Sequence, residues 1–226
     1  MVTAAASAAF IAFGVPASAQ PGSADILPPG FPCIHTNVYP LPLLEWGWGP
    51  IDGAAPRYAA DTGPSGAGYL DMYTPPDGVT NYFHPGINTP LSTLLGANSL
   101  GFLHRGATAF QLRIRGADRP DDLSGFTTLV WEPAYNNNEG AENWFLSGDL
   151  ARGNWWSTRD IGGQSAGATT ANLRRLDQIS NSNPRAFVTE YGVSVGRTSV
   201  ASQGAADDIT YGCARWDFEP APSGSG

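Results

Sequence analysis

Apolar and polar residues alternate in several short segments of the chain, and turn-forming residues separate these segments. Such alternation is typical of β-strands that bury one face. The clearest example is 108–116. It has an apolar face of Phe110, Leu112 and Ile114 and a polar face of Gln111, Arg113 and Arg115. Further strands are expected over 68–74, 81–83, 126–133, 142–148, 155–161, 185–196, 207–213 and 215–220.

The segment 185–196 has two possible faces, and the more apolar one is expected in the core. That face comprises Phe187, Thr189, Tyr191, Val193 and Val195. The opposite face, with Ala186, Val188, Glu190 and Gly192, is expected to point outward. Glu190 would then form a surface ion pair with Arg185 or Arg197.

Two tryptophans stand side by side in the stretch GNWWS, at positions 155 and 156. Neighbouring side chains of a strand point to opposite faces. We therefore expect one indole in the core and the other facing outward.

One short helix is predicted within 168–180, where Leu173, Leu176 and Ile179 recur at helical spacing. Asn183-Pro184 follows and ends it. Residues 39–50 are apolar but contain three prolines, which favours an edge segment. Residues 51–68 are rich in Gly, Ala and Pro and are expected to form a loop.

Many short strands with turns between them, one helix and no internal repeat predict an all-β protein built as a β-sandwich. We expect a signal peptide over 1–19, an extended segment over 20–38, a single sandwich domain over 39–220 and a disordered tail over 221–226. The signal peptide is inferred from an apolar run followed by Ala17-Ser18-Ala19, although no basic residue precedes the run. A secreted, extracellular protein is the expectation.

The formal charge of −8 limits the partners that we expect. All twelve basic residues are arginines, and they are scattered among twenty acidic residues. Nucleic-acid binding needs a basic stripe, and anionic membranes attract basic segments, so neither partner is expected. No long apolar run predicts insertion into a membrane.

The two cysteines, Cys33 and Cys213, lie near the ends of the predicted mature chain. In an oxidising compartment an isolated pair favours a disulfide. The bond would place the first and last ordered segments side by side.

The order of motifs from Gly68 to Ile209 resembles the laminin-B (laminin IV type A) family of jelly-roll domains and related secreted bacterial domains. The motifs are Gly68-Tyr69-Leu70, Tyr82-Phe83, Leu112-Arg113, Trp155, Leu173–Ile179 and Asp207-Asp208-Ile209. The loop over 162–170 and the N-terminal segment depart from the family pattern. The resemblance implies a jelly-roll sandwich that is non-catalytic and extracellular. Wider jelly-roll relatives often bind carbohydrate and a structural calcium ion.

Seven tryptophans suggest an aromatic platform for a sugar ring. The resemblance matches Trp155 to a family position, which leaves Trp156 as the additional, outward indole. The candidate ligand-binding residues are Trp156, Trp144, Trp131, Tyr135 and Asn137. Asp207 and Asp208 are candidate calcium ligands, since carboxylate oxygens suit that ion, although a solvated acidic strand end is the alternative.

Catalytic signals are weak. The sequence has no nucleophile elbow and no zinc-protease motif, and its three histidines lie in separate segments. Glu132, Glu139, Glu142 and Glu190 are possible members of a glycosidase pair.

The leading expectation is a non-catalytic domain that binds an extracellular polysaccharide or cell-envelope polymer. A polysaccharide-degrading glycosidase or lyase of sandwich fold is one alternative, and a structural or adhesive protein with a protein partner is another.

Overall fold

The computed structural model describes residues 33–40, 46–60, 65–137, 143–196 and 198–221. The predicted signal peptide, residues 20–32 of the predicted extended segment and residues 222–226 of the predicted tail lie outside these ranges. Among the described residues, no helix is both long enough and apolar enough to cross a membrane.

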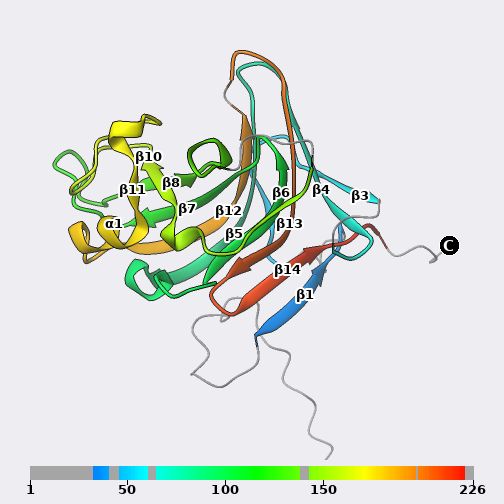
Figure 1. Cartoon of the computed structure of the whole chain (residues 1–226), viewed down its shortest axis with the longest axis horizontal. Coiled ribbons are helices and arrows are strands. Elements are labelled where there is room, and N and C mark those ends of the chain that lie inside the picture. Colours follow the sequence, from blue (N-terminus) through cyan, green and yellow to red (C-terminus); the bar gives the residue numbers. More distant parts are fainter. Residues whose placement is uncertain (1–32, 41–45, 61–64, 138–142, 197, 222–226) are drawn as a thin grey trace, which may run out of the picture.

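Two seven-stranded β-sheets face each other, as the all-β sandwich prediction requires (Figure 1). Sheet A contains β1 (Ile34–Val38), β14 (Ala214–Phe218), β13 (Ser202–Tyr211), β4 (Gly68–Thr74) and β3 (Arg57–Ala60), with β6 (Leu100–Gly106) beside β13 and β9 (Phe145–Ser147) beside β6. Sheet B has the order β11 (Arg174–Arg175), β10 (Asn154–Ser157), β8 (Thr127–Trp131), β7 (Ala109–Arg115), β12 (Phe187–Gly196), β5 (Val79–Pro90) and β2 (Gly49–Gly53).

One short α-helix, α1 (Leu176–Ser182), packs beside β11, and Figure 1 shows it at the left end of the molecule, away from β1 and β14. The short helix was predicted, but it begins later than Leu173. Arg174–Arg175 pair with β10 instead, and Arg175 is the N-cap, its backbone N–H bonded to Gln178 Oε1 at 3.0 Å. Four 3₁₀ turns complete the described elements: η1 (Leu91–Leu94), η2 (Pro133–Tyr135), η3 (Leu150–Arg152) and η4 (Thr170–Asn172).

The core lies between the two sheets and is rich in aromatic rings. Phe102 of β6 contacts Phe110 of β7 with ring centroids 5.5 Å apart. Tyr191 of β12 stacks on Tyr211 of β13 at 4.0 Å and accepts a hydrogen bond of 2.6 Å from Trp216 Nε1. These contacts fix the sheets face to face.

The alternation predicted for β7 and β10 is confirmed. Phe110, Leu112 and Ile114 are fully buried, whereas the residues between them remain more accessible. Trp155 is fully buried and donates its indole N–H to Leu150 O at 2.8 Å. Trp156 is partly exposed on the opposite face of β10.

The face predicted for β12 is wrong in its first half. The register shifts between Val188 and Glu190, so the strand carries a β-bulge there. An extra residue reverses the side-chain parity. Ala186 and Val188 therefore join Tyr191, Val193 and Val195 in the core, and Phe187 is partly exposed.

The first and last described strands lie side by side as predicted, because Cys33 and Cys213 form a disulfide across 180 residues of sequence. Next to it, β1 pairs with β14 in parallel, placing Ile34 opposite Ala214 and Val38 opposite Phe218. The N-terminal strand is thereby tied to the C-terminal hairpin of β13 and β14.

Candidate functional site

A groove of about 550 Å³ crosses the outer face of sheet B. Ligand sites in proteins commonly fall between about 300 and 1,000 Å³. Its lining includes one large aromatic side chain, Trp156, and several polar ones. The polar side chains include Asn81, Gln111, Arg113, Glu132 and Ser194.

Strand pairing brings these residues together from five strands or strand ends. Trp156 on β10 lies opposite Val130 on β8, and Val130 lies opposite Gln111 on β7. Ser194 on β12 lies opposite Asn81 on β5. Because side chains in register share one face of a sheet, an aromatic rim and polar floor form across the strands.

Trp156 forms one edge of the groove. Its indole Nε1 is buried and makes no hydrogen bond of normal geometry within the described part of the chain. The nearby carboxyl of Glu132 has its pKa raised by burial, and the Trp156 side chain partly offsets this as a weak donor. The pair presents an aromatic surface beside an acid that is harder to ionise than usual.

Arg113 provides the positive charge of the groove and is held from three sides. It donates to Glu190 Oε2 at 3.0 Å and to Asp52 Oδ2 at 3.2 Å. Its guanidinium lies 4.8 Å from the ring centre of Phe83. The ion pair predicted for Glu190 therefore exists, but with Arg113 rather than Arg185; the other expected partner, Arg197, lies outside the described residues.

Asn81 lies on the floor of the groove and is 6% exposed. Its Oδ1 accepts no hydrogen bond among the described residues. A buried polar atom without a partner costs about 1–3 kcal/mol, so such an atom beside a groove favours a ligand or water that supplies the donor.

The loop over 159–172 forms a wall of the groove through Ala166 and Gly167. Gly167 N donates to Ser157 O at 2.9 Å, and Ala166 N donates to Asp160 Oδ1 at 2.7 Å. Asn172 Nδ2 donates to Ala166 O at 2.6 Å. These bonds hold the wall against the end of β10.

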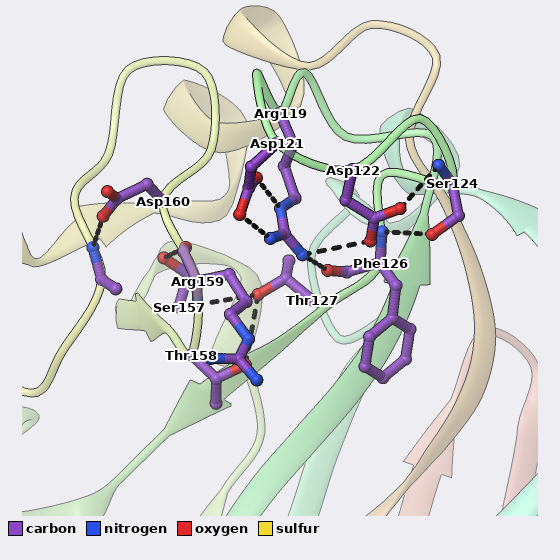
Figure 2. A network of polar contacts seen from close by, with 11 residues as sticks. Arg119, Asp121, Asp122, Ser124, Phe126, Thr127, Ser157, Thr158, Arg159 and Asp160 are labelled. Atoms are coloured by element: carbon purple, nitrogen blue, oxygen red, sulfur yellow. Dashed lines mark hydrogen bonds and ion pairs between the residues drawn. The ribbon is translucent and has the colours of Figure 1, made fainter.

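A second polar network supports the root of this wall (Figure 2). Arg159 N donates to Thr127 Oγ1 at 3.2 Å, and Thr128 N donates to Thr158 Oγ1 at 3.1 Å. In the adjoining turn, Arg119 forms two bonds with the Asp121 carboxylate, of 3.0 and 2.7 Å, and the acids around it raise the pKa of its guanidinium. These hydrogen bonds and this ion pair hold the segment from which the wall begins.

The predicted ligand-binding residues fall in different places. Trp156 lies in the groove, whereas Trp131 is 3% exposed and packs in the core against Phe102. Trp131 cannot present its face to a ligand, because it pairs with the inward-facing Trp155. That candidate is wrong.

Trp144 lies on the other side of the sandwich. It precedes β9 of sheet A, contacts Tyr69 with centroids 5.3 Å apart, and lies beneath the Arg105 guanidinium at 5.2 Å. The expectation that Trp144 and Trp156 share one platform is wrong, since their segments belong to different sheets.

Tyr135 and Asn137 lie at the end of β8, outside the groove lining. Tyr135 donates its hydroxyl to Ala168 O at 2.7 Å and so braces the wall. Asn137 is exposed, with a backbone φ of 60° in the turn after η2.

The candidate calcium ligands Asp207 and Asp208 lie on sheet A and point to different partners. Asp207 is fully buried, and its Oδ1 accepts a bond of 3.0 Å from Phe218 N. Burial raises the pKa of Asp207 to about 8. Asp208 forms a two-point ion pair with Arg215.

Sequence reasoning missed Asn81, Gln111 and Ser194 as groove residues. Each is a single polar residue at an outward position of a strand, a signal visible in 108–116 for Gln111. Their proximity depends on strand pairing between distant segments, which the sequence pattern does not encode.

A scan against protein-family models, a search of curated proteins and a search of solved structures each found no match. The resemblance to the laminin-B family therefore depends on the order of motifs alone, and the jelly-roll connection remains a prediction.

Proposed function

We propose that this protein is a secreted, non-catalytic recognition domain that binds an extracellular glycan or cell-envelope polymer in the groove of sheet B. The observation that carries the proposal is the partly exposed Trp156 at the edge of a groove with a polar floor. Pyranose rings stack on flat aromatic faces, and a few fixed polar groups orient their hydroxyls.

The polar groups of the groove suit a neutral or weakly charged glycan. The Asp52 and Glu190 carboxylates balance the Arg113 charge, so the groove has no uncompensated arginine among the described residues. Asn81 Oδ1 accepts no hydrogen bond among the described residues and can accept one from a sugar hydroxyl. Trp156 Nε1 makes only a weak contact with Glu132 and can donate to a sugar hydroxyl. Sugar hydroxyls act in both senses, so they can satisfy both atoms.

Three further features support action outside the cell. The Cys33–Cys213 disulfide is compatible with an oxidising compartment. The signal-peptide pattern and the motif order that resembles laminin-B domains point the same way.

The proposal is tested by binding of the purified protein to insoluble polysaccharides and cell-wall material, with calcium or with EDTA. Trp156→Ala should lose at least tenfold in affinity, since stacking adds about 0.5–1.5 kcal/mol to the burial of the ring and about 1.4 kcal/mol is tenfold. Trp144→Ala is the matched control, because it removes an indole from the opposite side of the sandwich. Equal binding by Trp156→Ala and the parent, or no binding to any polymer, would overturn the proposal.

A second candidate, a polysaccharide-degrading enzyme, is favoured only by Glu132. A carboxyl whose pKa is raised by burial is suited to act as a general acid. Its partner in the groove would be Asp52, which Arg113 already holds as an ion pair. Sugar released into the supernatant, and lost in Glu132→Gln, would select the enzyme over the recognition domain.

A further inference from the structure

A cluster of imidazole, carboxylate and guanidinium side chains lies on sheet A, where β1, β14 and β13 run side by side. The parallel register places His35 opposite Arg215 and Asn37 opposite Asp217. Asp208 has a backbone φ of 49° where the β13 register shifts, which turns its carboxylate toward Arg215. The disulfide fixes this register from its near end, and Ile34 N donates to Cys213 O at 2.8 Å.

Three possible metal ligands converge there. His35 Nε2 lies 3.5 Å from Asp217 Oδ2 and 4.0 Å from Asp208 Oδ1, and all three ligand atoms lie within 4.8 Å of one another. Metal–ligand bonds of about 2.1 Å at tetrahedral angles separate ligand atoms by about 3.4 Å. Small side-chain adjustments would therefore let one ion reach all three atoms.

The carboxylates of the cluster are deeply buried. Asp208 is 3% exposed and Asp217 is 4% exposed. Asp217 Oδ1 accepts no hydrogen bond within the described ranges. A buried carboxylate oxygen without a donor is unfavourable unless a cation compensates it. The His35 side chain, by contrast, is about half exposed at 49%, so the ligand set is open to solvent from one side.

Negative charge exceeds positive charge around these ligands. The carboxylates of Asp208 on β13, Asp217 on β14 and Glu219 after β14 lie close together, and Arg215 is the arginine beside them. Burial, followed by Glu219 and Asp208, raises the pKa of Asp217. A divalent cation would relieve this repulsion.

The Glu219 carboxylate is held by one backbone N–H group. Both of its carboxylate oxygens accept from Ala67 N, at 3.2 and 3.0 Å. A Cβ at Gly66 would lie 2.0 Å from Glu219 Oε1 and 3.1 Å from Asp217 Oδ1. The glycine therefore allows the backbone to close over these two acids.

From this geometry we propose that His35, Asp208 and Asp217 bind a divalent first-row transition-metal ion, with Zn²⁺ as the representative. Imidazole nitrogen suits Zn²⁺ and its neighbours in the series, whereas calcium and magnesium prefer six or more oxygen ligands. Three protein ligands leave a position for water. Arg215 stays on Asp208 and orients that carboxylate from outside, as supporting residues do in other metal sites.

The ion would join β1 to both strands of the C-terminal hairpin, since His35, Asp217 and Asp208 belong to three adjacent strands. It would reinforce the same junction as the disulfide. Binding should therefore raise the unfolding temperature as well as give a binding isotherm.

The test uses tag-free full-length protein treated with EDTA and then titrated with Zn²⁺, Co²⁺ or Ca²⁺. We expect one Zn²⁺ per chain, a higher unfolding temperature, and visible Co²⁺ absorption bands that indicate nitrogen and oxygen ligands. His35→Ala should weaken Zn²⁺ binding at least tenfold. It should fold, because the histidine is half exposed. Asp217→Asn should have the same effect.

Asp177→Asn is the matched control, because it removes a carboxylate from an ion pair with Arg175 at the start of α1, far from this cluster. Its Zn²⁺ affinity should equal that of the parent. The proposal is overturned by an absence of Zn²⁺ and Co²⁺ binding, or by binding that His35→Ala leaves unchanged. Calcium binding that is stronger than Zn²⁺ binding and independent of His35 would also overturn it.

Discussion

Acidification should destabilise this protein through one buried histidine, His104. The residue lies on β6, faces the core and is 1% exposed. Its ring stacks on Phe102 with centroids 4.6 Å apart, and its Nε2 lies 3.0 Å from Ser147 Oγ. Burial lowers the pKa of His104 from 6.5 to about 4, because the charged imidazolium has lost its hydration.

The sign follows from proton linkage. As the pH falls below 6.5, the unfolded chain takes up a proton at this histidine before the folded chain does, because the folded-state pKa is about 4. The contribution of His104 to stability is therefore complete above about pH 6.5 and is lost as the pH falls toward 4. With about 1.4 kcal/mol per pKa unit, the loss is about 2 kcal/mol at pH 5 and about 3 kcal/mol at pH 4.

The assay is urea unfolding at several pH values between 7.5 and 4, on the parent and on His104→Phe. Phenylalanine keeps an aromatic ring beside Phe102 but cannot titrate. Between pH 7.5 and 4, the free energy of unfolding of the parent should fall by about 3 kcal/mol more than that of the variant. Other ionisable groups act on both proteins, so the difference isolates His104.

Phe110→Leu is the control, because it weakens the same core without removing a titratable group. It should lose stability on acidification in parallel with the parent. The reasoning would be refuted if His104→Phe also fell in parallel with the parent. A His104 pKa near 6.5 in an NMR titration would refute it equally.

Two further predictions concern the covalent and packing restraints of the sandwich. The double variant Cys33→Ser/Cys213→Ser opens a loop closed across 180 residues, and its unfolding free energy should fall by about 5 kcal/mol in urea titrations. A loss below about 1 kcal/mol would contradict this estimate. Trp155→Ala should cost about 3–5 kcal/mol, since the indole is fully buried and its N–H bonds to Leu150 O. Trp144→Ala, measured in the same way, should cost clearly less, because that indole is only partly buried.

Periodicity predicted most of the strands because one face of each is buried. It worked for β7, where apolar and polar residues alternate without interruption. It failed for β12, because a bulge after Val188 reverses the parity and no residue type signals it. It also missed β3, whose Ala-rich sequence lies in a segment predicted as loop, and β6, although Leu100, Phe102 and His104 do alternate.

The candidate site was less predictable than the strands, and the tryptophans show why. Parity within β10 separates Trp155 from Trp156 correctly, because both lie in one strand. For Trp131 parity gives no answer, since all five residues of β8 are buried. To place Trp144 one must know which sheet its segment joins, and this depends on the pairing of β9 with β6.

The shape of the groove follows from side-chain size on the outer face of β12. Beyond the bulge, its outward positions are Gly192, Ser194 and Gly196. A glycine inside a strand commonly marks a place where another group approaches closely. At position 192 that group belongs to the chain itself, because a Cβ there would lie 2.9 Å from Phe83 Cγ.

The Phe83 ring in turn lies against the guanidinium of Arg113. The missing side chain at Gly192 therefore leaves room for the ring on which Arg113 packs. At Ser194 and Gly196 the small residues line the groove itself. Trp156 rises from β10 at the edge of the same face. A sheet face becomes concave where small residues lie beside a large one, so this face has a hollow at Ser194 and Gly196. This hollow is the reason to seek the ligand on sheet B rather than around Trp144, where Tyr69 and Arg105 already cover the indole.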